Sequence, residues 1–349
     1  MNDSALFCSR ELPSYPSYIF VERIIFCTSL VVNSVTIYCI LFRSPSYVGS
    51  YKYFLLYHVI GSSLLDLQIS GFLLPVVLVS YLSAYSLGFL NFIPSSILTV
   101  IGFASCGLVI ITSVLLFAYR HYQVIPSFHA HQLSKKKKIF GIILLHLYIM
   151  TSLPYVGWAY NKQEDYKARI RQISLSERQC LPYEVFQSDT YVIDLSFVPV
   201  LTLATIYMLT CIALCLYFMI HALKYISSVK IQTISDRRYQ LQRKYFITLL
   251  IQICVPVTII FIPIVALFCI FTGSEDQQGL TNLCFIFISC HGTVSSTCLI
   301  ILHPSYRKLF RRSILPEKIS VTPYSGDNSG GQMKIKELYQ GSKRASFAL

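Results

Sequence analysis

Seven long apolar stretches alternate with polar segments along this chain. They cover residues 19–41, 53–82, 92–119, 139–160, 191–222, 245–271 and 280–302. An α-helix needs about 20 predominantly apolar residues to cross the hydrocarbon core of a bilayer, and each stretch is long enough. The pattern therefore predicts an all-α membrane protein built as a bundle of seven transmembrane helices.

The polar segments on the two sides of the predicted membrane differ in charge. The segments after the first, third and fifth stretches and the C-terminal tail together carry 22 of the 29 Lys and Arg residues. The other 7 are Arg10, Arg23 and five residues within 162–178, where acidic side chains offset them. Because cytoplasmic loops collect positive charge, this distribution predicts an N-terminus outside the cell and a cytoplasmic C-terminus.

The composition excludes two broad classes of protein. Hydrophobic residues make up 54% of the chain and charged residues 13%, whereas soluble domains contain roughly 25% charged residues. The net charge of +13 is a feature of many nucleic-acid-binding proteins. Here the basic residues flank the apolar stretches, where anionic lipids of the inner leaflet attract them. We therefore predict the lipid bilayer as a partner and no nucleic acid.

The pattern divides the chain into three parts. Residues 1–18 contain Pro13 and Pro16 and lack the apolar core of a cleavable signal peptide, so we expect an extracellular N-terminal segment. Residues 19–306 form the seven-helix domain. Residues 307–349 begin with a basic segment and continue as a tail rich in Ser, Gly and Lys, a composition typical of disorder.

Cysteine usage separates two residues from the rest. Ten of the 12 cysteines lie within the apolar stretches, where thiols behave as small hydrophobic groups. The remaining two, Cys8 and Cys180, both fall on the predicted outer, oxidising side. Their position permits a disulfide between the N-terminal segment and the outer loop 161–190. Two free thiols are the alternative.

Sequence motifs of enzymes are absent. The chain contains no G-x-S-x-G, H-E-x-x-H, C-x-x-C or phosphate-binding G-x-x-x-x-G-K pattern. His291 and Ser295 are four residues apart and can share a helix face, but no nearby acid is identifiable that would orient a catalytic histidine. We expect these two residues to make interhelical hydrogen bonds, and we expect no catalysis, no cofactor and no metal.

Asp66 is the clearest ionisable residue inside an apolar stretch. It lies in the middle of the second stretch, close to His58 and Gln68. A charged group in lipid costs several kcal/mol unless it faces the interior of the bundle, so these three residues predict a polar interior. Asp66 can serve there as a structural hydrogen-bond acceptor between helices or as an ion or switch site, and the sequence leaves both open.

Three further ionisable residues within the apolar stretches are candidates for a role in the interior or at its rim. Asp194 lies one turn into the fifth stretch from the outer side. It can line a ligand cavity or remain a solvated acid at the membrane interface. His146 and His291 are expected to be interior histidines with satisfied hydrogen bonds rather than ligands of a metal.

The inner end of the third stretch carries Arg120, between Tyr119 and His121. In a seven-helix receptor such an arginine can reach toward neighbouring inner helices or toward a partner that inserts from the cytosol. The alternative is that its long side chain extends to the membrane interface. The residue type and position alone favour the extension to the membrane interface.

Seven short strings occur in order along the chain, and together they resemble one family. They are CILFRSP (39–45), LLDL (64–67), YSLG (85–88), CLP (180–182), LQRKYF (241–246), IQICVP (251–256) and ISCHGTVSS (288–296). The set resembles the nematode serpentine chemoreceptors, most closely class H of the Str superfamily. The resemblance covers nearly all of the predicted membrane domain.

The resemblance implies a chemosensory G-protein-coupled receptor, a multi-pass protein of the plasma membrane displayed on the cilia of sensory neurons. It implies an extracellular small-molecule or peptide ligand, a heterotrimeric G protein as partner, and Arg120 as the coupling residue. The family pattern resembles E-N-R-Y at this place, whereas this chain has Ala118, Tyr119, Arg120 and His121, so the acidic partner is missing. The alternatives are a transporter or channel, and a receptor-like partner that does not signal.

Overall fold

The computed structural model describes most of the membrane domain. The described residues are 16–44, 49–78, 83–125, 133–151, 197–230, 257–272 and 277–302, with shorter pieces at 154, 165–168, 172, 191–192, 251, 254–255 and 306–307. The chain divides into two units, Met1–Phe310 and Arg311–Leu349. All described residues belong to the first unit.

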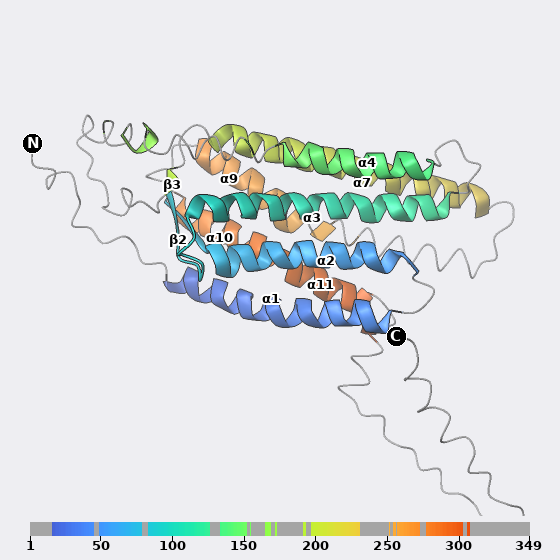
Figure 1. Ribbon diagram of the computed structural model, residues 1–349, viewed down its shortest axis with the longest axis horizontal. Coiled ribbons are helices and arrows are strands. Elements are labelled where there is room, and N and C mark those ends of the chain that lie inside the picture. Colours follow the sequence, from blue (N-terminus) through green and yellow to red (C-terminus); the bar gives the residue numbers. More distant parts are fainter. Residues whose placement is uncertain are drawn as a thin grey trace, which may run out of the picture. The chain divides into compact units, whose positions relative to one another are not determined.

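Helical segments occur within all seven predicted stretches, which confirms the α-helical fold class. They are α1 (Pro16–Arg43), α2 (Tyr51–Leu67) continued by the π-helical segment η3 (Gln68–Leu73), α3 (Ser95–Val124), α4 (Lys135–Met150), α7 (Phe197–Lys230), the π-helical segment η6 (Val257–Phe261) followed by α9 (Ile262–Thr272), and α10 (Gln278–Ser289) followed by α11 (His291–Leu302). The long helices α1, α2, α3, α4 and α7 run alongside one another (Figure 1).

Several of these helices are long and apolar enough to cross a membrane. Within the described residues, Pro16–Arg43, Ile97–Val124 and Thr202–Tyr225 meet this requirement singly. Helices α10 and α11 meet it together as one broken span, bent by 42°. Helices suit this environment because they satisfy their backbone hydrogen bonds internally, where no water is available.

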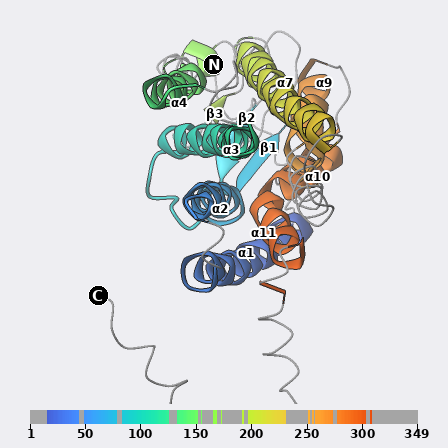
Figure 2. The same ribbon diagram turned by 90° about the vertical axis from the view of Figure 1, so that its right-hand side faces the viewer.

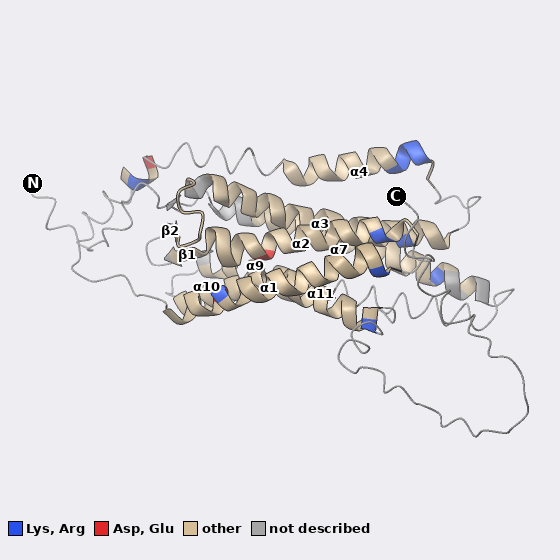
Figure 3. Ribbon diagram, turned by 60° about the horizontal axis from the view of Figure 1, so that its bottom comes forward, with Lys and Arg blue, Asp and Glu red and all other residues tan. Residues whose placement is uncertain are grey.

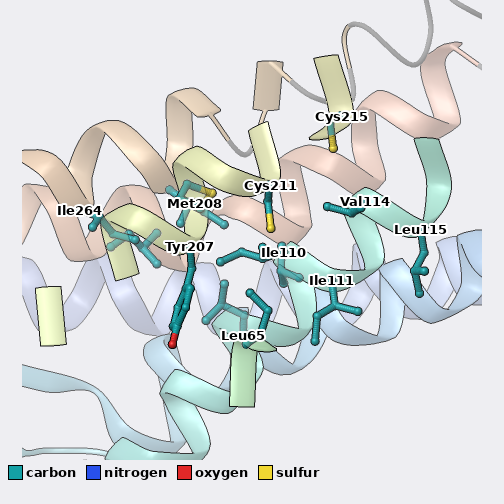
Figure 4. Packing of buried hydrophobic residues seen from close by; sticks show 14 of the residues in the cluster. Leu65, Ile110, Ile111, Val114, Leu115, Tyr207, Met208, Cys211, Cys215 and Ile264 are labelled. Carbon is teal, nitrogen blue, oxygen red and sulfur yellow. The ribbon is translucent and has the colours of Figure 1, made fainter. Parts of the chain in front are cut away.

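The apolar core is centred on α3, which packs against α2, α4 and α7. Figure 4 shows Ile110 and Val114 of α3 beside Cys211 and Cys215 of α7. Helix α4 buries only Ile149, so most of its apolar surface faces outward, as expected for a helix in contact with lipid. The ten cysteines of the apolar stretches are all free thiols.

A small antiparallel sheet lies at one end of the helices, and the sequence pattern did not predict it. Strand β1 (Pro75–Leu78) pairs with β2 (Ser83–Ser86), and β2 pairs with β3 (Tyr191–Val192). In Figure 2 the strands β1 and β2 lie among α2, α3 and α10, and Figure 1 places them at the end of these helices. We call the end of the bundle that carries β1, β2 and β3 the sheet end.

The prediction that the second stretch is one helix up to residue 82 is wrong beyond Leu73. Leu74 has a left-handed backbone conformation with φ of 41°, which is unfavourable for an L-residue and ends the helix. Pro75 follows and has no N–H with which to continue a helical ladder. A short apolar run fits a buried strand as well as a helix, so periodicity alone does not separate the two.

Side chains from the first and seventh spans hold the β1–β2 hairpin by its backbone carbonyls. The Tyr18 hydroxyl of α1 donates to the Pro75 carbonyl oxygen (2.9 Å), and the Gln278 amide of α10 donates to that of Val77 (2.5 Å). The Arg23 guanidinium donates to the Leu87 carbonyl oxygen (3.0 Å). The hairpin is therefore joined to both α1 and α10.

Basic residues gather at the opposite end of the helices, which we call the basic end. Figure 3 colours Lys and Arg blue and shows these residues in the first turn of α4 and toward the ends of its neighbours. Among the described residues they include Arg43, Lys52, Arg120, Lys135, Lys136, Lys137, Lys138, Lys224 and Arg307. Arg23 and Lys167 are the described basic residues that lie outside this group. The asymmetry expected from the sequence is thus present in the fold.

Candidate functional site

Asp66 lies near the end of α2, is fully buried, and accepts hydrogen bonds from two other helices. Its Oδ1 accepts from the backbone N–H of Gly292 (2.7 Å). Its Oδ2 accepts from the N–H and hydroxyl of Thr293 (2.7 and 3.0 Å) and from the hydroxyl of Ser29 (3.0 Å). Four donors therefore satisfy this carboxylate, and they join α2 to α1 and α11.

The two backbone donors belong to the first turn of α11. The seventh span breaks at Cys290, so α11 begins with His291, and the first N–H groups of a helix have no acceptor within that helix. In most helices a side chain just before the first turn accepts from the second or third N–H group. Here Asp66 does this from a different helix, and its position at the N-terminus of α11 is favourable for a negative charge.

Gly292 allows the two helices to approach this closely. A Cβ atom at this position would lie 2.6 Å from the carbonyl oxygen of Ser62 and 2.8 Å from Oδ2 of Asp66. Because the first of these atoms belongs to the backbone of α2, a side chain at residue 292 would push the helices apart. The glycine is therefore a geometric requirement of the hydrogen bonds between Asp66 and α11.

The network extends along one face of α1. The side-chain Nδ2 of Asn33 donates to the hydroxyl oxygen of Ser29 (2.8 Å), and the hydroxyl of Ser296 on α11 donates to the side-chain Oδ1 of Asn33 (2.6 Å). Glu22, Ser29 and Asn33 are all buried, and their spacings of seven and four residues place them on one side of the helix. The spacing of this polar stripe is visible in the sequence, although Glu22 was not among the residues predicted to face the interior.

His58 connects α2 to two further helices. Its Nδ1 lies 3.0 Å from the Thr112 hydroxyl of α3, and its Nε2 lies 3.4 Å from the Ser295 hydroxyl of α11. His58, Gln68 and Asp66 are all buried, which confirms the polar interior predicted for the second span. The contact of Ser295 also confirms the interhelical role expected for that residue.

Three buried residues near Asp66 have polar atoms that make no hydrogen bond within the described part of the chain. The atoms concerned are both carboxylate oxygens of Glu22, both ring nitrogens of His291 and the hydroxyl of Ser62. Ser289 is a neighbour of Glu22, but its hydroxyl donates to the backbone carbonyl oxygen of Ile286 (3.0 Å).

The two histidines predicted to be satisfied therefore differ. His146 bonds through one nitrogen to the Ile142 carbonyl oxygen (2.8 Å) and through the other to the Tyr57 hydroxyl (3.1 Å), as predicted. For His291 the prediction is wrong, because its ring is fully buried and meets His58 edge-on at 6.3 Å without a hydrogen bond among the described residues. No sequence signal distinguishes these two positions, since both histidines occur in apolar helices.

The basic end of α3 contacts a helix on each side. The Arg120 guanidinium lies 3.6 Å above the centre of the Tyr51 ring of α2, and its Nη1 donates to the Gln123 side chain (3.1 Å). The neighbouring His121 is buried and shares a hydrogen bond of 3.0 Å with His221 of α7. Adjacent residues of α3 thus face α2 and α7.

The structure brings together only part of the residue set expected from the sequence. Asp66 and His291 lie at the same joint between α2 and α11, whereas Arg120 lies at the basic end of α3. Cys8, Cys180 and Asp194 lie outside the described residues, so the disulfide and the ligand contact stay predictions. Within the described residues, no group of three or more His, Cys, Asp or Glu side chains is arranged to hold a metal ion.

Comparisons with known proteins agree with this architecture. The family model described as "Serpentine type 7TM GPCR chemoreceptor Srh" matches residues 14–315. Among solved structures, squid rhodopsin is similar with a TM-score of 0.54 and 11% sequence identity, covering 87% of each chain. At this identity the similarity concerns the fold alone. A search of the curated proteins found no match.

Proposed function

Because this chain belongs to the Srh family of serpentine seven-transmembrane chemoreceptors, we propose that it detects an extracellular small-molecule or peptide cue and activates a heterotrimeric G protein. The family resemblance inferred from short strings is confirmed, and the protein is a multi-pass membrane receptor of the chemosensory class. This is a family of receptors rather than of enzymes.

The observation that carries the proposal is the joint between Asp66 and the first turn of α11. Transmission of a signal requires an element with two arrangements, each favoured by a different ligand or partner. The seventh span is broken at Cys290. At this break the backbone N–H groups of Gly292 and Thr293 donate to Asp66 of α2, whereas in a continuous helix they would donate to carbonyl groups of the same helix. Such a joint can change its angle by exchanging hydrogen bonds without unfolding either half.

The two halves of the seventh span reach opposite ends of the bundle. Helix α10 begins at the sheet end, where Gln278 bonds to Val77 of β1. Helix α11 continues toward the basic end, where Leu299 packs in a cluster with Tyr51 of α2 and Leu116 of α3. A movement of α10 caused by a ligand at the sheet end would therefore act at the Asp66 joint and reach the basic end through α11.

The orientation in the membrane follows from the distribution of charge. We place the sheet end outside and the basic end in the cytoplasm, because cytoplasmic segments collect Lys and Arg. The N-terminus is then extracellular and the C-terminus cytoplasmic. Asp194 follows β3 by two residues in the sequence, which is consistent with a place at the rim of a ligand cavity. Display on sensory cilia remains an expectation from the family.

A transporter or channel is the alternative from a different class, and the broken span is the feature that favours it. In transporters the N-termini of broken helices point at a substrate. Here the first N–H groups of α11 already bond to Asp66, so they are not open to a substrate. The break therefore agrees better with an internal joint of a receptor than with a transport site.

The test distinguishes a signalling receptor from a transporter with the same active compound. Cells that express the receptor with a promiscuous G protein should respond to an active compound, and membranes from these cells should show ligand-dependent nucleotide exchange. Arg120→Ala should abolish the exchange at equal surface density while ligand binding persists. Flux of the compound into liposomes without nucleotide exchange would support a transporter. Ligand binding with neither response would support the receptor-like partner that does not signal.

A further inference from the structure

The Arg120 guanidinium lies over the ring of Tyr51, which in turn packs against a second aromatic ring. The guanidinium carbon is 3.6 Å from the centre of the Tyr51 ring, and Tyr51 is only 4% exposed. The Tyr51 ring stacks on Tyr119, with centres 5.7 Å apart and planes 30° apart, and Tyr119 meets Phe54 at 4.7 Å. The position of the ring is therefore determined by packing between α2 and α3.

We propose that Tyr51 is the positioning residue for Arg120. Its ring holds the guanidinium against the start of α2, and so withholds it from a G protein at the basic end until the receptor is activated. Tyr51 thereby takes the role of the acidic residue of the family pattern, whose place is occupied in this chain by Ala118. The inference deepens the proposed function and rests on Arg120 being the coupling residue.

The chemistry of the pair fits this role. The face of an aromatic ring carries partial negative charge and attracts a cation placed over it. For a partly desolvated pair the attraction changes an equilibrium by a factor of roughly 5 to 30. That is large enough to set a resting state and small enough for a ligand and a partner to reverse it. A planar guanidinium also stacks on a ring, which an ammonium group does not.

The same turn of α2 offers a matched control. Lys52 lies over Tyr53 at a longer distance of 5.2 Å, and Tyr53 is 60% exposed. This second cation–aromatic pair is one to two residues away in the sequence but does not involve α3. A change at Tyr53 alters the local composition of the basic end without altering the position of Arg120.

The test is the basal nucleotide exchange per receptor, measured without ligand at equal surface density. Tyr51→Leu should raise it about fivefold or more, because the ring that restrains Arg120 is gone. Tyr51→Phe keeps the ring and should give a smaller rise. Tyr53→Leu should leave basal exchange unchanged. The lowest basal exchange is expected from Arg120→Ala, alone or combined with Tyr51→Leu.

A fluorinated side chain separates the charge effect from packing. Pentafluorophenylalanine at position 51 keeps the shape of phenylalanine but removes the negative face of the ring. It should therefore raise basal exchange as Tyr51→Leu does. Because its shape is conserved, this variant tests the ring even where the leucine variant folds poorly. Equal basal exchange for the phenylalanine and pentafluorophenylalanine receptors overturns the positioning role, and coupling stands if Arg120→Ala is silent. If Arg120→Ala signals normally, both the coupling role and this inference are overturned.

Discussion

The Asp66 carboxylate caps a helix that begins 225 residues further along the chain, with its Oδ1 atom 2.7 Å from the backbone nitrogen of Gly292. The break at Cys290 leaves the first N–H groups of α11 without acceptors in their own helix, and the Asp66 side chain supplies these acceptors. A buried carboxylate is stable in such a place only when donors surround it. The joint and the acid therefore depend on each other.

Removal of the Asp66 carboxylate should destabilise the receptor. Asp66→Ala leaves the N–H groups of Gly292 and Thr293 without an acceptor, which should cost roughly 2–4 kcal/mol. Asp66→Asn keeps one acceptor oxygen but brings an NH₂ group toward other donors, and should cost about half as much. Thermal unfolding of the purified receptor in detergent measures both. An unchanged midpoint for Asp66→Ala would show that the cap has no energetic weight.

The sequence identifies Asp66 but not what it binds. An acid in an apolar span must face the interior, so its burial is predictable from one residue. Its main partners are backbone N–H groups, which become available only because the seventh span breaks at Cys290. No proline or glycine occupies that position. Gly292, two residues later, is the nearest local signal, and the acceptor of the freed N–H groups lies on a helix distant in sequence.

Gly292→Ala should disturb the joint without changing any polar group. The added methyl would lie 2.6 Å from the Ser62 carbonyl oxygen, and overpacking of this kind costs about 1–3 kcal/mol. The control is Gly279→Ala on α10, where a Cβ meets nothing within 4 Å and alanine favours the helix. The midpoint of thermal unfolding should fall for Gly292→Ala and stay equal or rise for Gly279→Ala. Equal midpoints for both variants would contradict the close approach.

Asn33 and Ser296 should be energetically coupled. They join α1 to α11 through one hydrogen bond of 2.6 Å, and bonds between membrane helices contribute on average about 0.6 kcal/mol. A double-mutant cycle of Asn33→Ala and Ser296→Ala isolates this contribution because each change removes one partner. A second cycle that pairs Asn33→Ala with Ser228→Ala, a distant residue of α7, should show additivity. Additivity in both cycles would rule out the bond between α1 and α11.

The fold was predictable where apolar length decides the structure and not where a short segment has two solutions. The positions of the helices follow from stretches too apolar for any other element in a membrane. The stretch 53–82 contains both a helix and a strand, because the left-handed Leu74 and then Pro75 end the helix. Pro75 was a visible signal for this end. The pairing of β3 with β2 had no such signal, since it joins residues more than one hundred positions apart.

Glu22 offers the opposite case to Asp66, although both acids are fully buried. Asp66 accepts four hydrogen bonds, whereas neither carboxylate oxygen of Glu22 has a partner among the described residues. Burial of a polar group without a partner lowers stability, and an apolar residue of similar size removes this cost. Glu22→Leu should therefore stabilise the receptor by about 1 kcal/mol or more.

We therefore expect substitutions of the two acids to shift the midpoint of thermal unfolding in opposite directions. Glu22→Leu should raise the midpoint of unfolding, Glu22→Gln should change it less, and Asp66→Ala should lower it. If Glu22→Leu stabilises the receptor, the acid is present for its function and not for stability, because an unsatisfied polar group inside a membrane helix is kept only where the protein uses it. Ligand-dependent nucleotide exchange should then decrease in the stabilised variant. If Glu22→Leu instead lowers the midpoint as Asp66→Ala does, Glu22 is a structural acceptor like Asp66, and its oxygens have partners beyond the described contacts.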